Sequence, residues 1–87
     1  MTERVDRYAA NWLDKARFAR ICNENGEKWP PWSTGEIIAV ALILDDAGMF
    51  IALDITKQEA LDRLRYDLEL PDIVGAARWF ADLRAQL

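Results

Sequence analysis

The strongest structural signal in the chain is the sequence STGEIIAVALIL at residues 33–44. Its first four residues form a capping box, in which the Ser33 hydroxyl accepts a hydrogen bond from the backbone N–H of Glu36 and the Glu36 carboxylate accepts one from the N–H of Ser33. The eight residues that follow are all apolar, which is also typical of a buried β-strand. The capping box favours a helix over about 34–46. Because this helix has no polar face, we expect it to be the central element.

The same start signal recurs later in the chain. Thr56-Lys57-Gln58-Glu59 is a second capping box, and it predicts a helix over about 57–68. Pro71 then disfavours helical geometry at the residue before it but suits the first turn of a new helix, which we place at about 71–86. The apolar faces of these two helices consist of Ala60, Leu61, Leu64 and Leu68, and of Ile73, Ala76, Ala77, Phe80, Leu83 and Leu87.

The N-terminal part of the chain predicts one long helix over about 3–24. Thr2 can cap its start, and Gly26 ends it because glycine tolerates the left-handed conformation of a helix terminus. On a helical wheel its core face consists of Val5, Tyr8, Ala9, Trp12, Leu13, Ala16 and Ala19.

Residues 49–55 fit two interpretations, namely further helical turns near 49–54 or a packed apolar connector. We favour the helical turns. The predicted fold is therefore all-α, a single domain over 1–87 built as a compact bundle of four main helices.

Composition and charge limit the classes of partner that the chain is expected to bind. A chain of 87 residues has room for one core, yet it carries four Trp, three Phe and two Tyr, and we expect a second chain to bury part of this large apolar surface. The net charge is −4, and residues 29–56 contain four acidic groups and no basic one. Because proteins that grip nucleic acid usually present a basic face, nucleic acid is not the expected partner.

The sequence shows neither a targeting segment nor a familiar set of catalytic or metal-binding residues. The N-terminal residues lack the apolar stretch of a signal peptide, the longest strongly apolar run is far shorter than the about 18 residues of a membrane span, and the single Cys22 allows no intrachain disulfide. We therefore predict a cytoplasmic protein without a membrane segment. With no histidine, the usual catalytic and metal constellations are missing, so we predict neither an enzyme nor a cofactor.

The acidic residues Asp45, Asp46 and Asp54 are the one cluster that could hold a hard cation such as Mg²⁺. Their spacing is not that of a calcium loop, and carboxylates at a helix end are ordinary surface groups. We favour the surface interpretation.

Several apolar side chains are not needed for one core face, and these are the candidate partner-binding residues. They lie on a second side of the first helix, in the Trp-Pro-Pro-Trp loop, on the back of the last helix and at two isolated aromatic positions: Phe18, Ile21 and Cys22; Trp29 and Trp32; Val74, Ala81 and Ala85; Tyr66 and Trp79.

Packing remains the competing role for some of these candidates. Cys22 is either a redox-sensitive thiol or a small apolar filler, and filler is favoured. Trp29 and Trp32 are either an exposed platform or packed side chains. Packing is favoured for both, and Trp32 also stands opposite Ile37 in a hydrophobic staple. Tyr66 is expected to be more exposed than Trp79.

Residues 57–86 also fit a helix-turn-helix-like nucleic-acid-binding regulator, in which the last helix would contact the bases. Its outward residues would be Asp72, Val74, Arg78, Asp82 and Ala85. One arginine among acids and alanines is a poor surface for the major groove. This alternative is therefore the second choice.

Three segments, Trp32–Glu36, Ala39–Leu42 and Glu59–Arg65, resemble small proteins encoded by actinobacterial phages. The likeness is one of pattern and covers residues 32–68. The resemblance implies a bacterial cytoplasm and a non-structural phage role, and it brings no catalytic residues. We therefore predict a protein-protein interaction or regulatory module that acts on a host or phage protein, with a homodimer as one possible assembly.

Overall fold

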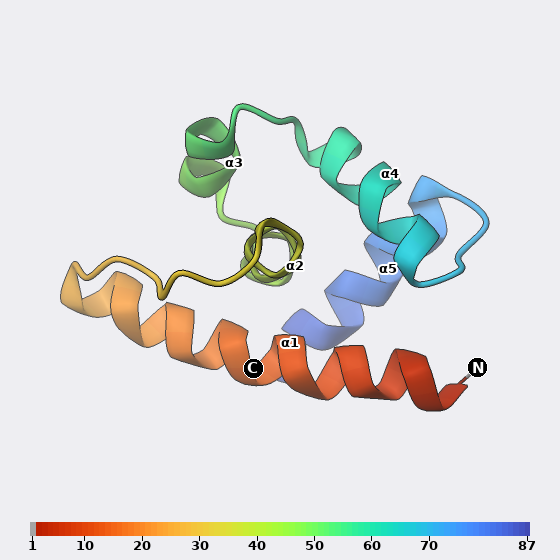
Figure 1. Cartoon of the computed structure of the whole chain (residues 1–87), viewed down its shortest axis with the longest axis horizontal. Coiled ribbons are helices and arrows are strands. Elements are labelled where there is room, and N and C mark those ends of the chain that lie inside the picture. The colour runs from red at the N-terminus through yellow and green to blue at the C-terminus, as the bar shows by residue number, and fades with distance from the viewer. Residues whose placement is uncertain (1) are drawn as a thin grey trace.

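A computed structural model describes the backbone of residues 2–87 and the side chains of residues 7–87. The described part is all-α, with five helices and no strand: α1 Thr2–Asn25, α2 Thr34–Leu44, α3 Ala47–Leu53, α4 Lys57–Asp67 and α5 Ile73–Arg84 (Figure 1). The all-α prediction is confirmed. The predicted turns near 49–54 form a separate fifth helix, and the second helix ends at Leu44 rather than near 46. The Thr2 side chain and Val5 lie outside the described side chains.

The long helix α1 sets the size of the molecule. Its 24 residues rise by about 1.5 Å each and so span about 36 Å, which matches the longest extent of the molecule, 36 Å. Figure 1 shows α1 along one side, with the other helices gathered on a single side of it. The radius of gyration of 12.2 Å agrees with the about 12 Å expected of a compact domain of this length.

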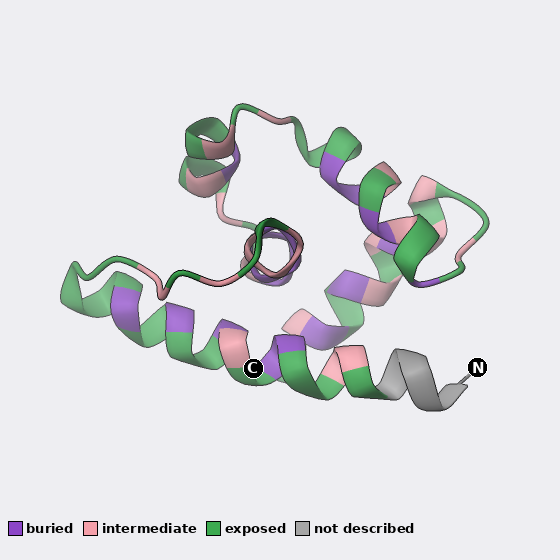
Figure 2. Cartoon of the chain, viewed as in Figure 1, coloured by how far each residue is buried: buried purple, intermediate pink, exposed green. Residues whose placement is uncertain are grey.

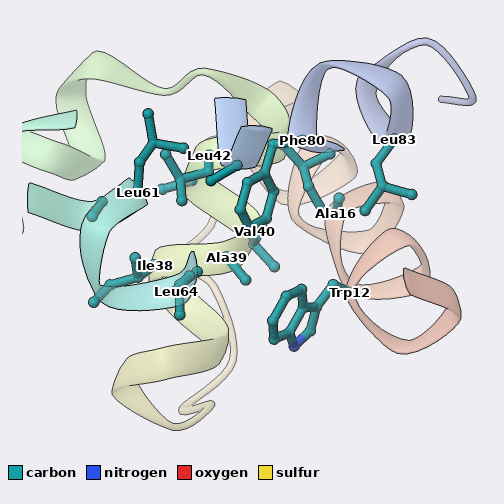
Figure 3. Close-up of a cluster of buried hydrophobic side chains, with 14 of the residues drawn as sticks. Trp12, Ala16, Ile38, Ala39, Val40, Leu42, Leu61, Leu64, Phe80 and Leu83 are labelled. Carbon is teal, nitrogen blue, oxygen red and sulfur yellow. The ribbon is translucent and has the colours of Figure 1, made fainter. Parts of the chain in front are cut away.

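The apolar helix α2 lies in the middle, as predicted. Its residues 38–43 are all buried, and it packs against α1, α3, α4 and α5. The close-up in Figure 3 shows side chains of α1, α2, α4 and α5 meeting in one cluster around Val40, Leu64 and Phe80. A helix without a polar face is stable here because its neighbours remove all of its sides from water.

Both predicted capping boxes are present. The Ser33 Oγ accepts from the N–H of Glu36 at 3.3 Å, and Glu36 Oε1 accepts from the N–H of Ser33 at 3.1 Å. The Thr56 box has the same two bonds at 3.0 and 2.9 Å. These bonds satisfy backbone donors that a helix start leaves without an intrahelical partner, so they fix where α2 and α4 begin.

The end of α2 is closed by a side chain from far along the sequence. Arg84 donates from Nε to the carbonyl of Ile43 at 2.7 Å and from Nη2 to the carbonyl of Leu42 at 2.8 Å. These carbonyls belong to the last turn of α2, where the helix dipole is negative and a cation is favoured. Arg84 thus ties the end of α5 to the end of α2.

Candidate protein-binding surface

The loop after α1 is turned back by a glycine. Gly26 has a φ of +69°, the N–H of Glu27 bonds to the carbonyl of Cys22 at 2.8 Å, and the N–H of Gly26 bonds to that of Asn23 at 3.3 Å. This pair of bonds is a Schellman motif, with glycine in the left-handed position. The turn brings residues 27–33 back beside the C-terminal half of α1 (Figure 1).

Trp29 is held in place by a hydrogen bond to α1. Its Nε1 donates to Asn23 Oδ1 at 2.8 Å, while Asn23 Nδ2 donates to Asp46 Oδ2 at 3.3 Å. Asp46 caps α3 by accepting from the N–H of Met49. The asparagine therefore connects the loop, α1 and the start of α3, and its bond orients the Trp29 ring.

The rings of the loop and of α1 form a continuous aromatic group. The Trp29 and Trp32 rings lie 6.2 Å apart, and the Phe18 and Trp32 rings lie 6.4 Å apart at 67°. Ile21 follows Phe18 by three residues and so lies on the same face of the helix. We call these four side chains, Phe18, Ile21, Trp29 and Trp32, the aromatic patch.

The aromatic patch is partly open to solvent. Phe18 and Ile21 are each 52% exposed, and Trp29 and Trp32 are half-buried. Figure 2 shows the outer side of α1 as mostly exposed, with the buried positions turned towards the other helices. The packing roles favoured for Trp29 and Trp32 are therefore compatible with a part in an exposed surface.

A lysine and a glutamate border the patch on the side of α2. The Lys15 Nζ lies 5.9 Å from the centre of the Trp32 ring and 3.3 Å from Glu36 Oε2. The hydrogen bond from the backbone of Ser33 lowers the pKa of the Glu36 carboxyl, and the nearby Lys15 ammonium lowers it further. The border of the patch on this side thus carries an ion pair next to an aromatic ring.

Charges of both signs border the patch along α1. Arg17 Nη1 lies 3.5 Å from Asp14 Oδ1, and Arg17 Nη2 donates to the carbonyl of Gln86 at 3.1 Å. Glu24 is exposed and lies one residue before the end of the helix. All three charged residues are solvent-exposed, so their contacts within the chain contribute little to stability.

Cys22 does not belong to this surface. The helical wheel placed it off the core face, and that placement was wrong, because the side chain is only 5% exposed. The chain turns back directly after this residue, since the N–H of Glu27 bonds to the carbonyl of Cys22. The burial agrees with the filler interpretation of this thiol.

The remaining candidates lie apart from the aromatic patch. Trp79 packs edge-on against Trp12 and Phe80, with ring centres 5.9 and 4.9 Å away, so it extends the core. Tyr66 is exposed as expected, and its ring lies under the guanidinium of Arg65 at 4.2 Å. The strip on the back of α5 is also exposed, and it consists of Val74, Ala81 and Ala85.

One exposed apolar residue was not predicted. Ile51 on α3 is 80% exposed, the largest exposure among the large hydrophobic side chains described. Residues 49–55 were left between two interpretations, so no face was assigned to Ile51. The available signal was Asp46, a residue type that commonly caps a helix start and that sets the start of α3 at Ala47.

The acidic cluster has structural roles. Asp45 and Asp54 follow the ends of α2 and α3, and Asp45 pairs with Lys57 at 2.9 Å, a hydrogen bond that lowers the pKa of the Asp45 carboxyl. Among the residues the structure describes, no three His, Cys, Asp or Glu side chains are grouped so that they could hold a metal ion. None of the described helices is both long and apolar enough to cross a membrane.

Comparison of the chain with models of protein families, with curated proteins and with solved structures finds no match.

Proposed function

We propose that this chain is a small protein-interaction module, a non-structural phage protein that acts in the bacterial cytoplasm by binding another protein through the aromatic patch. The observation that supports the proposal is the exposure of Phe18 and Ile21, 52% each, beside two tryptophans in ring contact. Contiguous exposed apolar surface marks interaction sites in soluble proteins, and tryptophan is among the residues that contribute most to binding energy.

The fixed orientation of Trp29 supports the same function. A side chain already held by its hydrogen bond to Asn23 loses little conformational freedom when a partner covers it. The neighbouring Phe18 and Ile21 lie on a helix and so also start from restricted rotamers. The patch is therefore preorganised for binding.

Nucleic-acid binding through α4 and α5 is less well supported. The outward side of α5 carries Arg78 between the exposed carboxylates of Asp72 and Asp82. Asp72 is also the N-cap of α5, so an acidic group stands at the end of the helix that would enter a groove. Repulsion from phosphates opposes this mode of binding.

Site-specific crosslinking in an actinobacterial host tests the proposal. The photoreactive residue p-benzoylphenylalanine replaces Ile21 in one variant and the exposed Asp82 in a control variant. We expect discrete protein adducts from position 21 and none of the same mass from position 82. We also expect Phe18→Ser to reduce the yield of the adducts from position 21. Absence of adducts from position 21, or identical adducts from both positions, would contradict the proposal.

A further inference from the structure

We propose that the partner covering the aromatic patch is a second copy of this chain, bound through antiparallel pairing of the two α1 helices. The inference rests on the proposed function and names its partner. Its starting point is the spacing of four exposed residues on the outer side of α1, namely Asp14, Phe18, Ile21 and Asn25. Steps of four, three and four residues place them along one line of a helix, the spacing by which helices pair side by side.

A two-fold axis between residues 19 and 20 makes this line self-complementary. It sets Phe18 of one copy against Ile21 of the other, so that the apolar side chains cover each other. It also sets Asp14 against Asn25, a carboxylate acceptor against an amide donor. Since each contact occurs twice in such a dimer, one helix face supplies both halves of the interface.

The flanking charges favour the antiparallel arrangement. Arg17 and Glu24 are seven residues apart, so they lie on the same flank of the line. Antiparallel pairing brings Arg17 of each copy close to Glu24 of the other, giving two ion pairs. Parallel pairing in register would instead set Asp14 against Asp14, with like charges in contact.

The charge distribution also favours a second copy over a strongly charged partner. Residues 1–28 carry six basic and five acidic groups, whereas the whole chain has a net charge of −4. Two α1 helices therefore approach each other without the repulsion that the net charge of the whole protein would predict. The border of the aromatic patch along α1 carries both positive and negative side chains, so a uniformly acidic or uniformly basic partner would be attracted to it only weakly.

Sedimentation equilibrium of the parent chain and of charge variants tests the pairing. The apolar line is short, so we expect a weak dimer with a Kd between about 1 μM and 1 mM. The weight-average mass of the parent should rise with concentration from the 10.0 kDa of one chain towards twice that value. Arg17→Glu and Glu24→Arg should each weaken dimerisation by roughly threefold to tenfold, because each places like charges opposite one another.

The double variant Arg17→Glu/Glu24→Arg distinguishes the interface from contacts within the chain. It restores opposite charges between the two copies, so we expect its Kd to return to within about twofold of that of the parent. The contacts of Arg17 with Asp14 and Gln86 are lost in the double variant as well as in Arg17→Glu. A double variant as weak as the single ones would therefore overturn the pairing, with thermal melts confirming that all variants fold.

A parent chain that stays monomeric up to millimolar concentration would also overturn self-pairing. If position 21 still forms an adduct with a different protein in cells, the proposed function stands and only the identity of the partner is wrong. If position 21 forms no adduct at all, both proposals fail.

Discussion

Acidic residues occupy the positions where glycine usually ends a helix. Asp45, Asp54 and Glu69 have φ values of 53°, 56° and 57°, all in the left-handed region. Each is followed by a residue whose N–H bonds to a carbonyl five positions earlier, at 3.0, 3.1 and 2.8 Å, as in the turn at Gly26. Three helix ends thus contain the left-handed turn that usually has a glycine, although an acidic residue stands there instead. A side chain in this conformation costs backbone strain.

Glu69 should be the most strained of the three, because aspartate tolerates this conformation better than glutamate does. We expect Glu69→Gly to be more stable than Glu69→Ala by about 1 kcal/mol in urea unfolding. The alanine variant is the matched control, since it removes the same carboxylate but keeps a Cβ in the left-handed region. Equal stability of the two variants would show that the conformation stores no strain.

The glycine that ends α1 was predictable from the sequence, but the acidic residues that take the same position at other helix ends were not. Gly26 was predicted to end α1 because glycine is the common residue at that position. Asp45 gave no comparable signal, so α2 was extended to about 46 instead of ending at Leu44. The burial of Cys22 could not be predicted from a helical wheel, because a wheel describes one helix alone and not the rest of the chain around it.

At the scale of elements, the two capping boxes made the helix starts predictable. They are local patterns of four residues, and both sets of bonds are present in the fold. The attachment of α5 to α2 through Arg84 was not predictable, because the two partners are more than 40 residues apart in the sequence. Residues whose partners lie far along the chain leave no periodic signal.

The Glu36 carboxylate makes the stability of α2 depend on pH. The pKa of this carboxyl is lower in the folded chain than in the unfolded chain. The ionised carboxylate therefore adds fully to the free energy of unfolding above the pKa of the unfolded chain, and this stabilisation is lost as the pH falls below about 4.5. We expect Glu36→Gln to cost about 1 kcal/mol at pH 7 and markedly less at pH 3. Urea unfolding at the two pH values measures the difference.

Asp82→Asn is the control for this pH dependence, because it removes a negative charge from an exposed position in the last turn of α5, away from the capping box. It should change the free energy of unfolding by less than about 0.5 kcal/mol at either pH. An equal cost of Glu36→Gln at pH 7 and pH 3 would mean that the charge of Glu36 contributes nothing to the capping box.

The bond between α5 and α2 can be tested through Arg84. Arg84→Met removes two charge-assisted hydrogen bonds to the last carbonyls of α2, and we expect a loss of about 1–3 kcal/mol in the free energy of unfolding. Arg78→Met, on the exposed side of the same helix, should cost less than about 0.5 kcal/mol. Similar losses for both variants would contradict the structural role of Arg84.

At the scale of the whole molecule, the fold buries one group of apolar side chains and leaves several others exposed. The buried group surrounds α2, with Leu64 and Ala39 fully covered. Among the exposed side chains, Phe18 and Ile21 of the aromatic patch lie on the outer side of α1, while the two tryptophans of the loop also pack against the core. The wheel predicted that Phe18 and Ile21 leave the core face, but their contact with the tryptophans depends on how the loop folds back after Gly26 and on Asn23, which no local pattern encodes.

We expect Phe18 and Ile21 to contribute little to the stability of the fold and to be available for a partner. The free energy of unfolding of the double variant Phe18→Ser/Ile21→Ser, measured in urea at low micromolar or lower concentration, where self-association adds little, tests it most directly. We expect the double variant to lie within about 1 kcal/mol of the parent, whereas Leu64→Ala in the core should lose about 2–5 kcal/mol. A loss of about 3 kcal/mol or more in the double variant, as large as a core deletion, would show that these side chains stabilise the fold and would contradict their availability for a partner.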